Sequence, residues 1–232
     1  ETPAPEMIAR VLSLLERIPV AIVTGRDFGR IEPDFLPIIA SSPHVDRFFL
    51  FPEGAAQCLQ WNDGLWKELY ATSLSDEEYT RIKAAVEGAI EETGVLEGLP
   101  VFGEQLLRKR GMATLAALGV GVPHDLKYTW DPGNARREKL FSAIKRALPD
   151  LEVLMGGATS IDVTRKGVDK AYGVRWLAEH LRIPPADMLF VGDALYPGGN
   201  DYVVIETGIK THSTSGPEET ARILDELLVQ CA

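Results

Sequence analysis

Cysteines and long apolar runs are both scarce in this sequence. The 232 residues include two cysteines, Cys58 and Cys231, which lie far apart and in no metal-binding or redox spacing. We therefore expect two free thiols, rather than a disulfide or a cysteine metal site. No apolar run reaches the roughly 18 residues that a membrane-spanning helix needs, and the first residues do not follow a signal-peptide pattern. These absences favour a cytoplasmic protein that does not enter a membrane.

Positive charge is also in deficit. The chain carries 24 Lys and Arg residues against 34 Asp and Glu residues, which gives a formal net charge of −10. Nucleic-acid binding is therefore not expected, because it requires a basic surface. A phosphorylated small molecule could still bind, but local cations would have to hold it against the overall field.

The most informative stretch of the sequence runs from residue 188 to residue 201. It begins with a short apolar run, typical of a strand buried on both faces of a parallel sheet, and the run ends at Gly192 and Asp193. A wide turn then leads to Asn200 and Asp201. Ligands of open α/β sheets bind beyond the carboxyl ends of the strands, and carboxylate and amide oxygens suit Mg²⁺. The alternative is an ordinary surface turn, since Asp, Asn, Gly and Pro are common in turns.

The pattern of the whole chain predicts an α/β core interrupted by an α+β insertion. For the core, apolar spacing predicts a helix at 6–17, buried strands at 20–23 and 48–51, a hairpin at 55–69 and a helix after residue 170. For the insertion it predicts a helix at 75–92, two strands within 105–121, a helix at 133–148 and a hairpin at 151–163.

Polar residues with possible roles in phosphate binding follow the strand at 20–23 and precede the helix after residue 170. Thr24 offers a hydroxyl beside free backbone N–H groups, although Thr and Gly are also common in caps and turns. Lys170 stands at a helix start, where a cation is unfavourable, so it requires an anionic partner. The basic run Arg108-Lys109-Arg110 is more typical of a solvated face.

These motifs together resemble the haloacid dehalogenase superfamily, subfamily IIB. The segment Gly192-Asp193 with Pro197-Gly198-Gly199-Asn200-Asp201 resembles its fourth motif, in the form found in eukaryotic-type phosphomannomutases and related bacterial hydrolases. Thr24 takes the place of the second motif, and Lys170 that of the third. The resemblance implies that Thr24, Lys170 and Asp193 are catalytic and that Mg²⁺ is the cofactor. The implied metal ligands are Asp193, Asn200 and Asp201.

The resemblance also implies where a sugar phosphate binds. The segment Gly156-Gly157-Ala158-Thr159-Ser160-Ile161-Asp162 resembles the element of the family whose Ser and Asp hold the sugar. The implied substrate-binding residues are Gly25, Arg26, Arg110, Ser160 and Asp162.

Three departures from the family pattern are visible. The Asp-x-Asp motif, whose first Asp attacks phosphorus in the family, does not occur in this sequence, so we expect it upstream of these residues or expect a non-catalytic relative. Pro52-Glu53-Gly54 lacks an Asn found in the mutases. Residues 113–122 contain none of the arginines with which mutases hold a second phosphate.

The sequence therefore predicts an open, Rossmann-like α/β core with an inserted α+β cap. The expected boundaries are 1–73 and 164–232 for the core and 74–163 for the cap. The expected function is that of a Mg²⁺-dependent phosphatase acting on a phosphosugar or a similar small phosphate ester through an aspartyl-phosphate. A phosphomannomutase-type mutase and a non-catalytic phosphate-binding protein are the alternatives. The oligomeric state is left open between a monomer and a cap-mediated homodimer.

Overall fold

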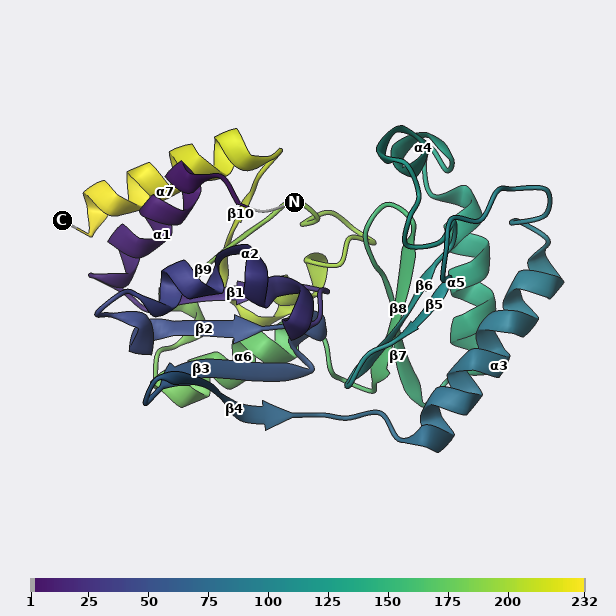
Figure 1. Cartoon of the computed structure of the whole chain (residues 1–232), viewed down its shortest axis with the longest axis horizontal. Helices are drawn as coiled ribbons and strands as arrows, with labels where there is room; N and C mark the ends of the chain where they lie inside the picture. Colours follow the sequence, from purple (N-terminus) through teal and green to yellow (C-terminus); the bar gives the residue numbers. More distant parts are fainter. Residues whose placement is uncertain (1–2, 232) are drawn as a thin grey trace. The chain divides into compact units, whose positions relative to one another are not determined.

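The structure is a computed structural model that describes residues 3–231, without the side chains of Glu32 and Asp34. Residues 1, 2 and 232, where the predicted core segments begin and end, lie outside the described part. The chain divides into two compact units (Figure 1). The first unit comprises Glu1–Ala71, Lys170–Pro197 and Asp201–Ala232, and the second comprises Thr72–Asp169 and Gly198–Asn200.

The first unit contains two small sheets built around parallel strand pairs. In the four-stranded sheet, with order β1-β2-β3-β4, β1 and β2 are parallel and the others antiparallel. In the two-stranded sheet, β9 and β10 are parallel. The strands are β1 (Val20–Val23), β2 (Phe48–Phe51), β3 (Gln57–Asn62), β4 (Leu65–Ala71), β9 (Leu189–Gly192) and β10 (Lys210–Ser213). The predicted α/β fold with a parallel core is confirmed, and an antiparallel hairpin extends one edge.

The sequence pattern did not indicate two helices of the first unit, one at 217–230 and one at 28–40. The helix at 28–40 contains Pro33 and Pro37, which break a helical pattern, yet Leu36 and Ile39 on its apolar face are fully buried. Tertiary burial thus outweighs the local cost of the prolines. The α-helices are α1 (Pro5–Leu15), α2 (Phe28–Ala40), α6 (Lys170–Leu181) and α7 (Pro217–Gln230). The 3₁₀ turns are η1 (Val45–Arg47), η2 (Glu53–Ala55), η3 (Pro185–Asp187) and η4 (Tyr202–Thr207).

Strand β2 is apolar throughout because helices cover both of its faces. Phe48 and Leu50 pack in one cluster with residues of α1 and α2, whereas Phe49 and Phe51 pack in another with Leu177 of α6. Cys58 belongs to the second cluster, where burial raises the pKa of its thiol. Both cysteines are free thiols, as predicted.

The strands β1, β9 and β10 run in the same direction. Helix α1 leads into β1 and α7 follows β10, each through a short turn, and the two helices lie side by side (Figure 1). Arg10 pairs with Asp225, and Arg17, just beyond the end of α1, donates to the carbonyl of Leu228 further along α7, so α1 and α7 are parallel. The carboxyl ends of these strands therefore lie at the same edge of the unit, where ligands of such folds bind.

The second unit is an antiparallel sheet, of order β5-β6-β8-β7, with helices packed on one face. Ala113, Leu115, Ile161 and Val163 point into the helix-covered core. Its elements are α3 (Asp76–Thr93), β5 (Leu106–Arg108), β6 (Met112–Ala116), α4 (His124–Thr129), α5 (Ala135–Ala147), β7 (Leu151–Met155) and β8 (Ser160–Arg165). The short α4 was not predicted. Among the helices described in either unit, none is long and apolar enough to cross a membrane.

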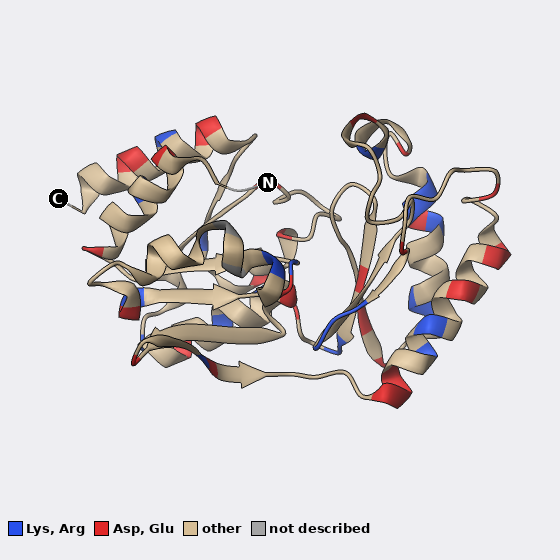
Figure 2. Ribbon diagram, viewed as in Figure 1, with Lys and Arg blue, Asp and Glu red and all other residues tan. Residues whose placement is uncertain are grey.

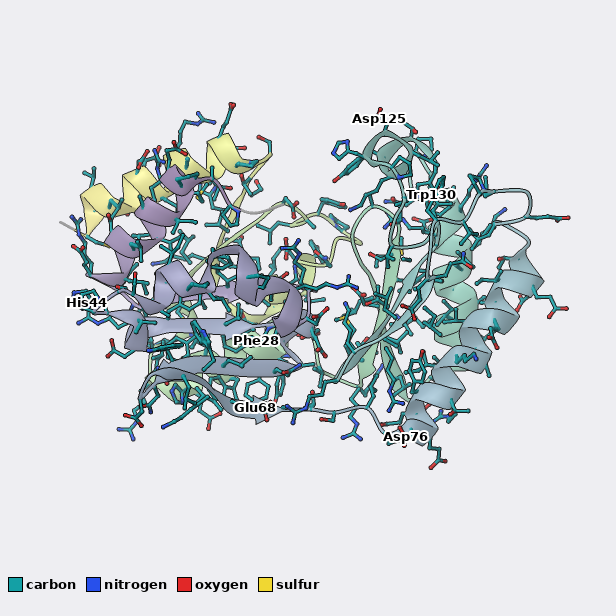
Figure 3. All side chains as sticks on the ribbon, in the orientation of Figure 1. Phe28, His44, Glu68, Asp76, Asp125 and Trp130 are labelled. Atoms are coloured by element: carbon teal, nitrogen blue, oxygen red, sulfur yellow. The ribbon has the colours of Figure 1, made fainter. Side chains whose placement is uncertain are left out.

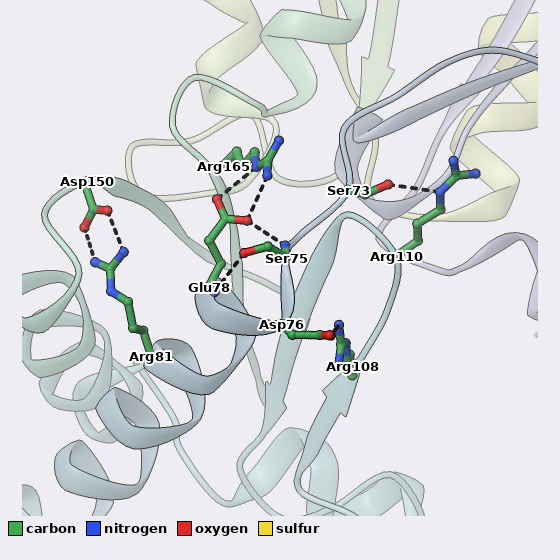
Figure 4. A network of polar contacts seen from close by, with 9 residues as sticks. All are labelled: Ser73, Ser75, Asp76, Glu78, Arg81, Arg108, Arg110, Asp150 and Arg165. Atoms are coloured by element: carbon green, nitrogen blue, oxygen red, sulfur yellow. Dashed lines mark hydrogen bonds and ion pairs between the residues drawn. The ribbon is translucent and has the colours of Figure 1, made fainter.

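A polar network joins the start of α3 to the end of β8 (Figure 4). Ser75 and Glu78 form a reciprocal capping box at the first turn of α3. Glu78 also accepts two hydrogen bonds from Arg165, each 2.9 Å long. The Arg165 guanidinium, assisted by the hydrogen bond from the Ser75 N–H, lowers the pKa of Glu78 from its ordinary 4.5 to about 2.

We predict that Glu78→Gln destabilises the protein near neutral pH, because it weakens both the capping box and the ion pair. A group whose pKa is lowered on folding stabilises the protein above its unfolded pKa, and that contribution is lost as the pH falls through the folded value. The loss at pH 7 should be about 1 kcal/mol, since Arg165 is partly exposed. Urea denaturation at pH 7 and pH 3 measures the difference, which should shrink at pH 3. The neighbouring exposed Glu77→Gln is the control, and an equal effect of both variants would contradict the assignment.

Candidate active site

Thr24 lies in a loop that the turn after β2 holds in place. The Thr24 N–H donates to the Phe51 carbonyl at 2.9 Å and so extends the pairing of β1 with β2. In return, the Gly54 N–H donates to Thr24 O at 2.8 Å, and the Glu53 N–H donates to Arg26 O at 2.9 Å. The Arg26 N–H also donates to the Thr24 hydroxyl at 3.2 Å. The loop that contains Thr24, Gly25 and Arg26 is therefore fixed by backbone hydrogen bonds at the carboxyl end of β1.

The turn that holds this loop has a strained backbone. Glu53, Gly54 and Ala55 have φ angles of 53°, 65° and 74°, in the left-handed region. For Glu and Ala this conformation costs roughly 1–2 kcal/mol per residue. Glu53 is also buried, with 2% of its surface exposed. Strain held by surrounding structure is common at functional sites.

Helix α6 packs directly against this turn and presents Lys170 at its first position. A Cβ on Gly173 would lie 2.7 Å from the Cβ of Ala55, so only glycine permits this close approach. Lys170 Nζ lies 2.5 Å from Asp201 Oδ1, and the two side chains are only 15% and 3% exposed. The expected anionic partner of Lys170 is therefore Asp201. A buried pair of this kind interacts strongly, and loss of either partner would leave an uncompensated charge.

Asp201 also supports the turn that contains Asp193. Its Oδ2 accepts a hydrogen bond from the Ala194 N–H at 3.1 Å. A Cβ on Gly192 would lie 2.4 Å from the same oxygen, so the end of β9 fits closely over the carboxylate. Asp193 itself is exposed. Contacts thus run from the Thr24 loop through η2 and α6 to Asp201 and on to the Asp193 turn, all within the first unit.

The fit of these residues to Mg²⁺ is partial. Exposed Asp193 offers hard oxygen ligands of the kind that Mg²⁺ prefers. Both carboxylate oxygens of Asp201 already accept hydrogen bonds, from Lys170 and from Ala194. Asn200 belongs to the second unit by its contacts. Among the side chains that the structure describes, no group of three from His, Cys, Asp and Glu could hold a metal ion. The described residues therefore offer Mg²⁺ only part of a ligand set.

The second unit brings Ser160 and Asp162 together on the sheet face opposite its helices. Register pairs Ala116 with Ser160 and Thr114 with Asp162, and the Thr114 hydroxyl donates to Asp162 Oδ1 at 2.6 Å. A Cβ added to Gly156 would lie 2.5 Å from the Ser160 hydroxyl and 2.8 Å from Asp162 Oδ2. Thr114 was not singled out in the sequence, because its contact with Asp162 depends on strand register.

Arg110 lies away from Ser160 and Asp162. It is in the basic turn between β5 and β6 (Figure 2), and its Nε donates to the Ser73 hydroxyl at 3.1 Å. β6 begins at Met112, which pairs with Thr164, and ends at Ala116, which pairs with Ser160. Arg110 and Ser160 are therefore at opposite ends of the same strand pair.

Solved structures with similar folds include phosphatases. The N-terminally truncated IMP-nucleotidase of Plasmodium falciparum superposes with a TM-score of 0.73 at 16% identity, over 99% of this chain and 66% of that chain. The trehalose-6-phosphate phosphatase of Aspergillus fumigatus superposes with a TM-score of 0.54 at 15% identity, over 99% of this chain and 84% of that chain. At these identities the likeness establishes the fold.

Sequence relatives identify the family. A phosphomannomutase of Oryza sativa subsp. indica is 25% identical over 224 residues, which cover 94% of this chain and 85% of the relative. A phosphomannomutase of Drosophila melanogaster is 27% identical over 186 residues, covering 78% of this chain and 71% of the relative. The sequence profile described as "Eukaryotic phosphomannomutase" matches residues 7–230. The chain therefore belongs to the eukaryotic phosphomannomutase family, whose fold it shares with haloacid dehalogenase-type phosphatases.

Proposed function

We propose that this protein is a Mg²⁺-dependent phosphatase that acts on a phosphosugar or a similar small phosphate ester. The observation that carries the proposal is the buried ion pair between Lys170 and Asp201 beneath the Asp193 turn. Contacts through α6 and η2 connect this pair to the fixed Thr24 loop. Phosphoryl transfer depends on positioning and charge neutralisation more than on covalent help, and the fixed loop together with the held lysine supports such a role.

Each of these residues takes a distinct part in the reaction. The Thr24 hydroxyl and the backbone at Gly25 and Arg26 hold the phosphoryl oxygens, and Lys170 offsets negative charge. An attacking carboxylate forms an O–P bond as the bond from phosphorus to the sugar oxygen breaks, and the second Asp of the expected Asp-x-Asp motif, acting as general acid, gives that oxygen the proton with which the sugar alcohol leaves. Water then hydrolyses the aspartyl-phosphate to release phosphate. Mg²⁺, when bound, neutralises charge on the phosphoryl group. Asp193 would be its ligand, with Asn200 and Asp201 completing that end of the site.

The attacking carboxylate itself belongs, in our proposal, on a strand that pairs between β1 and β9. Within the described residues, β1 and β9 are each at the end of their sheet, with one edge not paired to another strand. Both are apolar, yet every residue of β1 is only partly buried and Leu189 of β9 is 38% exposed, whereas β2 is fully buried. Unpaired apolar edges are a liability in sheet proteins. A parallel strand there would cover both edges and bring its carboxyl end between Thr24 and Asp193.

Phosphatase activity is preferred over mutase activity because of the second unit. A mutase must hold a second phosphate, and residues 113–122 contain no arginine. Arg110, the nearest basic candidate, donates to Ser73. The match to the phosphomannomutase profile favours the alternative, a sugar phosphomutase. An assay with mannose 1-phosphate and a catalytic amount of a hexose bisphosphate separates the two: a phosphatase releases inorganic phosphate, whereas a mutase produces mannose 6-phosphate.

We predict that Asp193→Asn in the natural protein lowers Mg²⁺-dependent turnover by about 10²-fold or more, the typical effect of removing one preorganised charge. The change keeps the shape of the side chain, so the melting temperature should stay within about 2 °C of wild type, as for other exposed substitutions. Steady-state release of phosphate from a generic ester measures turnover. Exposed Asp187→Asn, just before β9, serves as the matched control. Near-normal turnover by Asp193→Asn would refute its role.

We predict that the 232 residues alone bind Mg²⁺ weakly and do not hydrolyse sugar phosphates. A synthetic peptide with an apolar run ending in Asp-x-Asp should restore some turnover by pairing with β1 and β9. The same peptide ending in Asn-x-Asn is the control. Phosphate release from a panel of sugar phosphates measures the effect. Robust metal-dependent turnover without peptide would show that the nucleophile lies within these residues, and equal turnover with both peptides would rule out its place on the added strand.

We predict that Gly156→Ala abolishes binding of a sugar phosphate with little change in secondary structure. Its Cβ would enter the space between the Ser160 hydroxyl and Asp162 and would force both side chains apart. Gly157→Ala is the matched control, because its Cβ would lie 3.7 Å from the Ser160 hydroxyl, an ordinary contact. Isothermal titration with mannose 6-phosphate compares the two variants. Equal affinities would show that the sugar binds elsewhere.

A further inference from the structure

The turn between β7 and β8 leads directly to the two side chains assigned to the sugar. Within it, the Gly156 N–H donates to Ser160 O at 2.9 Å, and the Ser160 N–H donates to Gly157 O at 3.1 Å. Thr159 O accepts from the Ala117 N–H at 2.8 Å. The position of Ser160 therefore depends on the orientation of the Gly157 carbonyl.

A buried arginine binds that same carbonyl. Arg137, with 6% of its surface exposed, donates from one terminal nitrogen to Gly157 O and from the other to Asn134 Oδ1. The next carbonyl of the turn, that of Ala158, accepts from the indole N–H of Trp130 at 3.2 Å. Trp130, labelled in Figure 3, is the C-cap residue of α4 and begins the segment that leads to α5. Two adjacent carbonyls of the turn are thus held by two side chains from one neighbouring segment.

Asp131 fixes the position of Arg137. Its carboxylate accepts the backbone N–H groups of Arg136 and Arg137, at 2.8 and 3.0 Å. Arg137 Nε lies 3.7 Å from Asp131 Oδ2, and the two side chains are 7% and 3% exposed. Asp131 therefore caps the first turn of α5 and partly neutralises the buried guanidinium.

The buried pair of Arg137 and Asp131 costs free energy of folding, so it needs a role beyond filling space. Burying a charged pair costs several kcal/mol of desolvation per ion, and well-packed apolar residues often replace such a pair without loss of stability. A guanidinium can hold two acceptors in one plane with little loss of entropy, which apolar residues or a lysine cannot do. The specific effect of Arg137 is therefore to fix where the Gly157 carbonyl points.

We propose that Arg137, held by Asp131, is a positioning residue that sets the placement of Ser160 relative to Asp162 and so determines affinity for the sugar. The inference rests on the proposed function, in which Ser160 and Asp162 bind the sugar. The gap between these two side chains is too narrow for a Cβ at Gly156, so a small movement of the turn changes the geometry that a ligand meets. Displacements of about 1 Å in a binding site can cost on the order of 10²-fold in function.

The test compares Arg137→Lys with Arg136→Lys in the natural protein. Lysine keeps the charge but cannot bind two acceptors in one plane, whereas Arg136 is exposed and donates from its backbone. Titration with mannose 6-phosphate should give a dissociation constant raised about tenfold or more for Arg137→Lys and unchanged for Arg136→Lys. Trp130→Phe, which removes only the donor to Ala158 O, should weaken binding in the same direction.

Amide hydrogen exchange, measured without ligand, makes failure of this proposal distinguishable from failure of the proposed function. Exchange at residues 157–160 should be faster in Arg137→Lys than in wild type, while β7 and α5 keep their protection. Unchanged exchange at the turn, or unchanged affinity while Ser160→Ala and Asp162→Asn lose binding, would overturn the positioning role. If Ser160→Ala and Asp162→Asn bind like wild type, the sugar-site assignment fails and, with it, the role of Arg137 in affinity.

Discussion

The arrangement of the first unit depends on the ion pair between Lys170 and Asp201. A lysine at the first position of a helix opposes the helix dipole, and its side chain is almost entirely buried. The carboxylate that compensates it is also the acceptor for the Ala194 N–H and the group against which Gly192 packs. One interaction therefore fixes the start of α6 and the turn that exposes Asp193. For the phosphate site that we propose in this acidic protein, this placement of a cation is the central requirement.

Both units use glycine and buried charge to place functional groups closely. In the first unit, Gly173 lets α6 approach the strained turn at η2, and that turn fixes the Thr24 loop. In the second unit, Gly156 leaves room for Ser160 and Asp162, while Arg137 orients the turn between β7 and β8. In each unit, a glycine allows close contact because it has no side chain, and a buried ionic group fixes the position of the neighbouring turn.

Much of the fold could be read from local pattern. The strands at 20–23 and 48–51 match the structure in their bounds, because short apolar runs bounded by polar turns are typical of parallel strands. The predicted burial is confirmed for the strand at 48–51, whereas the strand at 20–23 is only partly buried. The hairpin turn also formed where Asp63 and Gly64 indicated it, with φ angles of 52° and 82°. Helix α2 was missed because its prolines hide a periodicity that only burial of its apolar face stabilises. The short α4, which has no buried residue, was missed as well, and so were β10 and α7.

For the candidate site, the sequence by itself determined which residue types follow the strands and the need of Lys170 for an anionic partner. These are consequences of local chemistry and of the helix dipole. Only the tertiary structure decided that Asp201 is that partner, that Arg110 lies at the far end of β6 from Ser160, and that Arg137 and Thr114 act on the turn and on Asp162. These contacts join residues that are far apart in the chain. They depend on strand register and helix packing, which arise from the summed burial of many side chains rather than from any single motif.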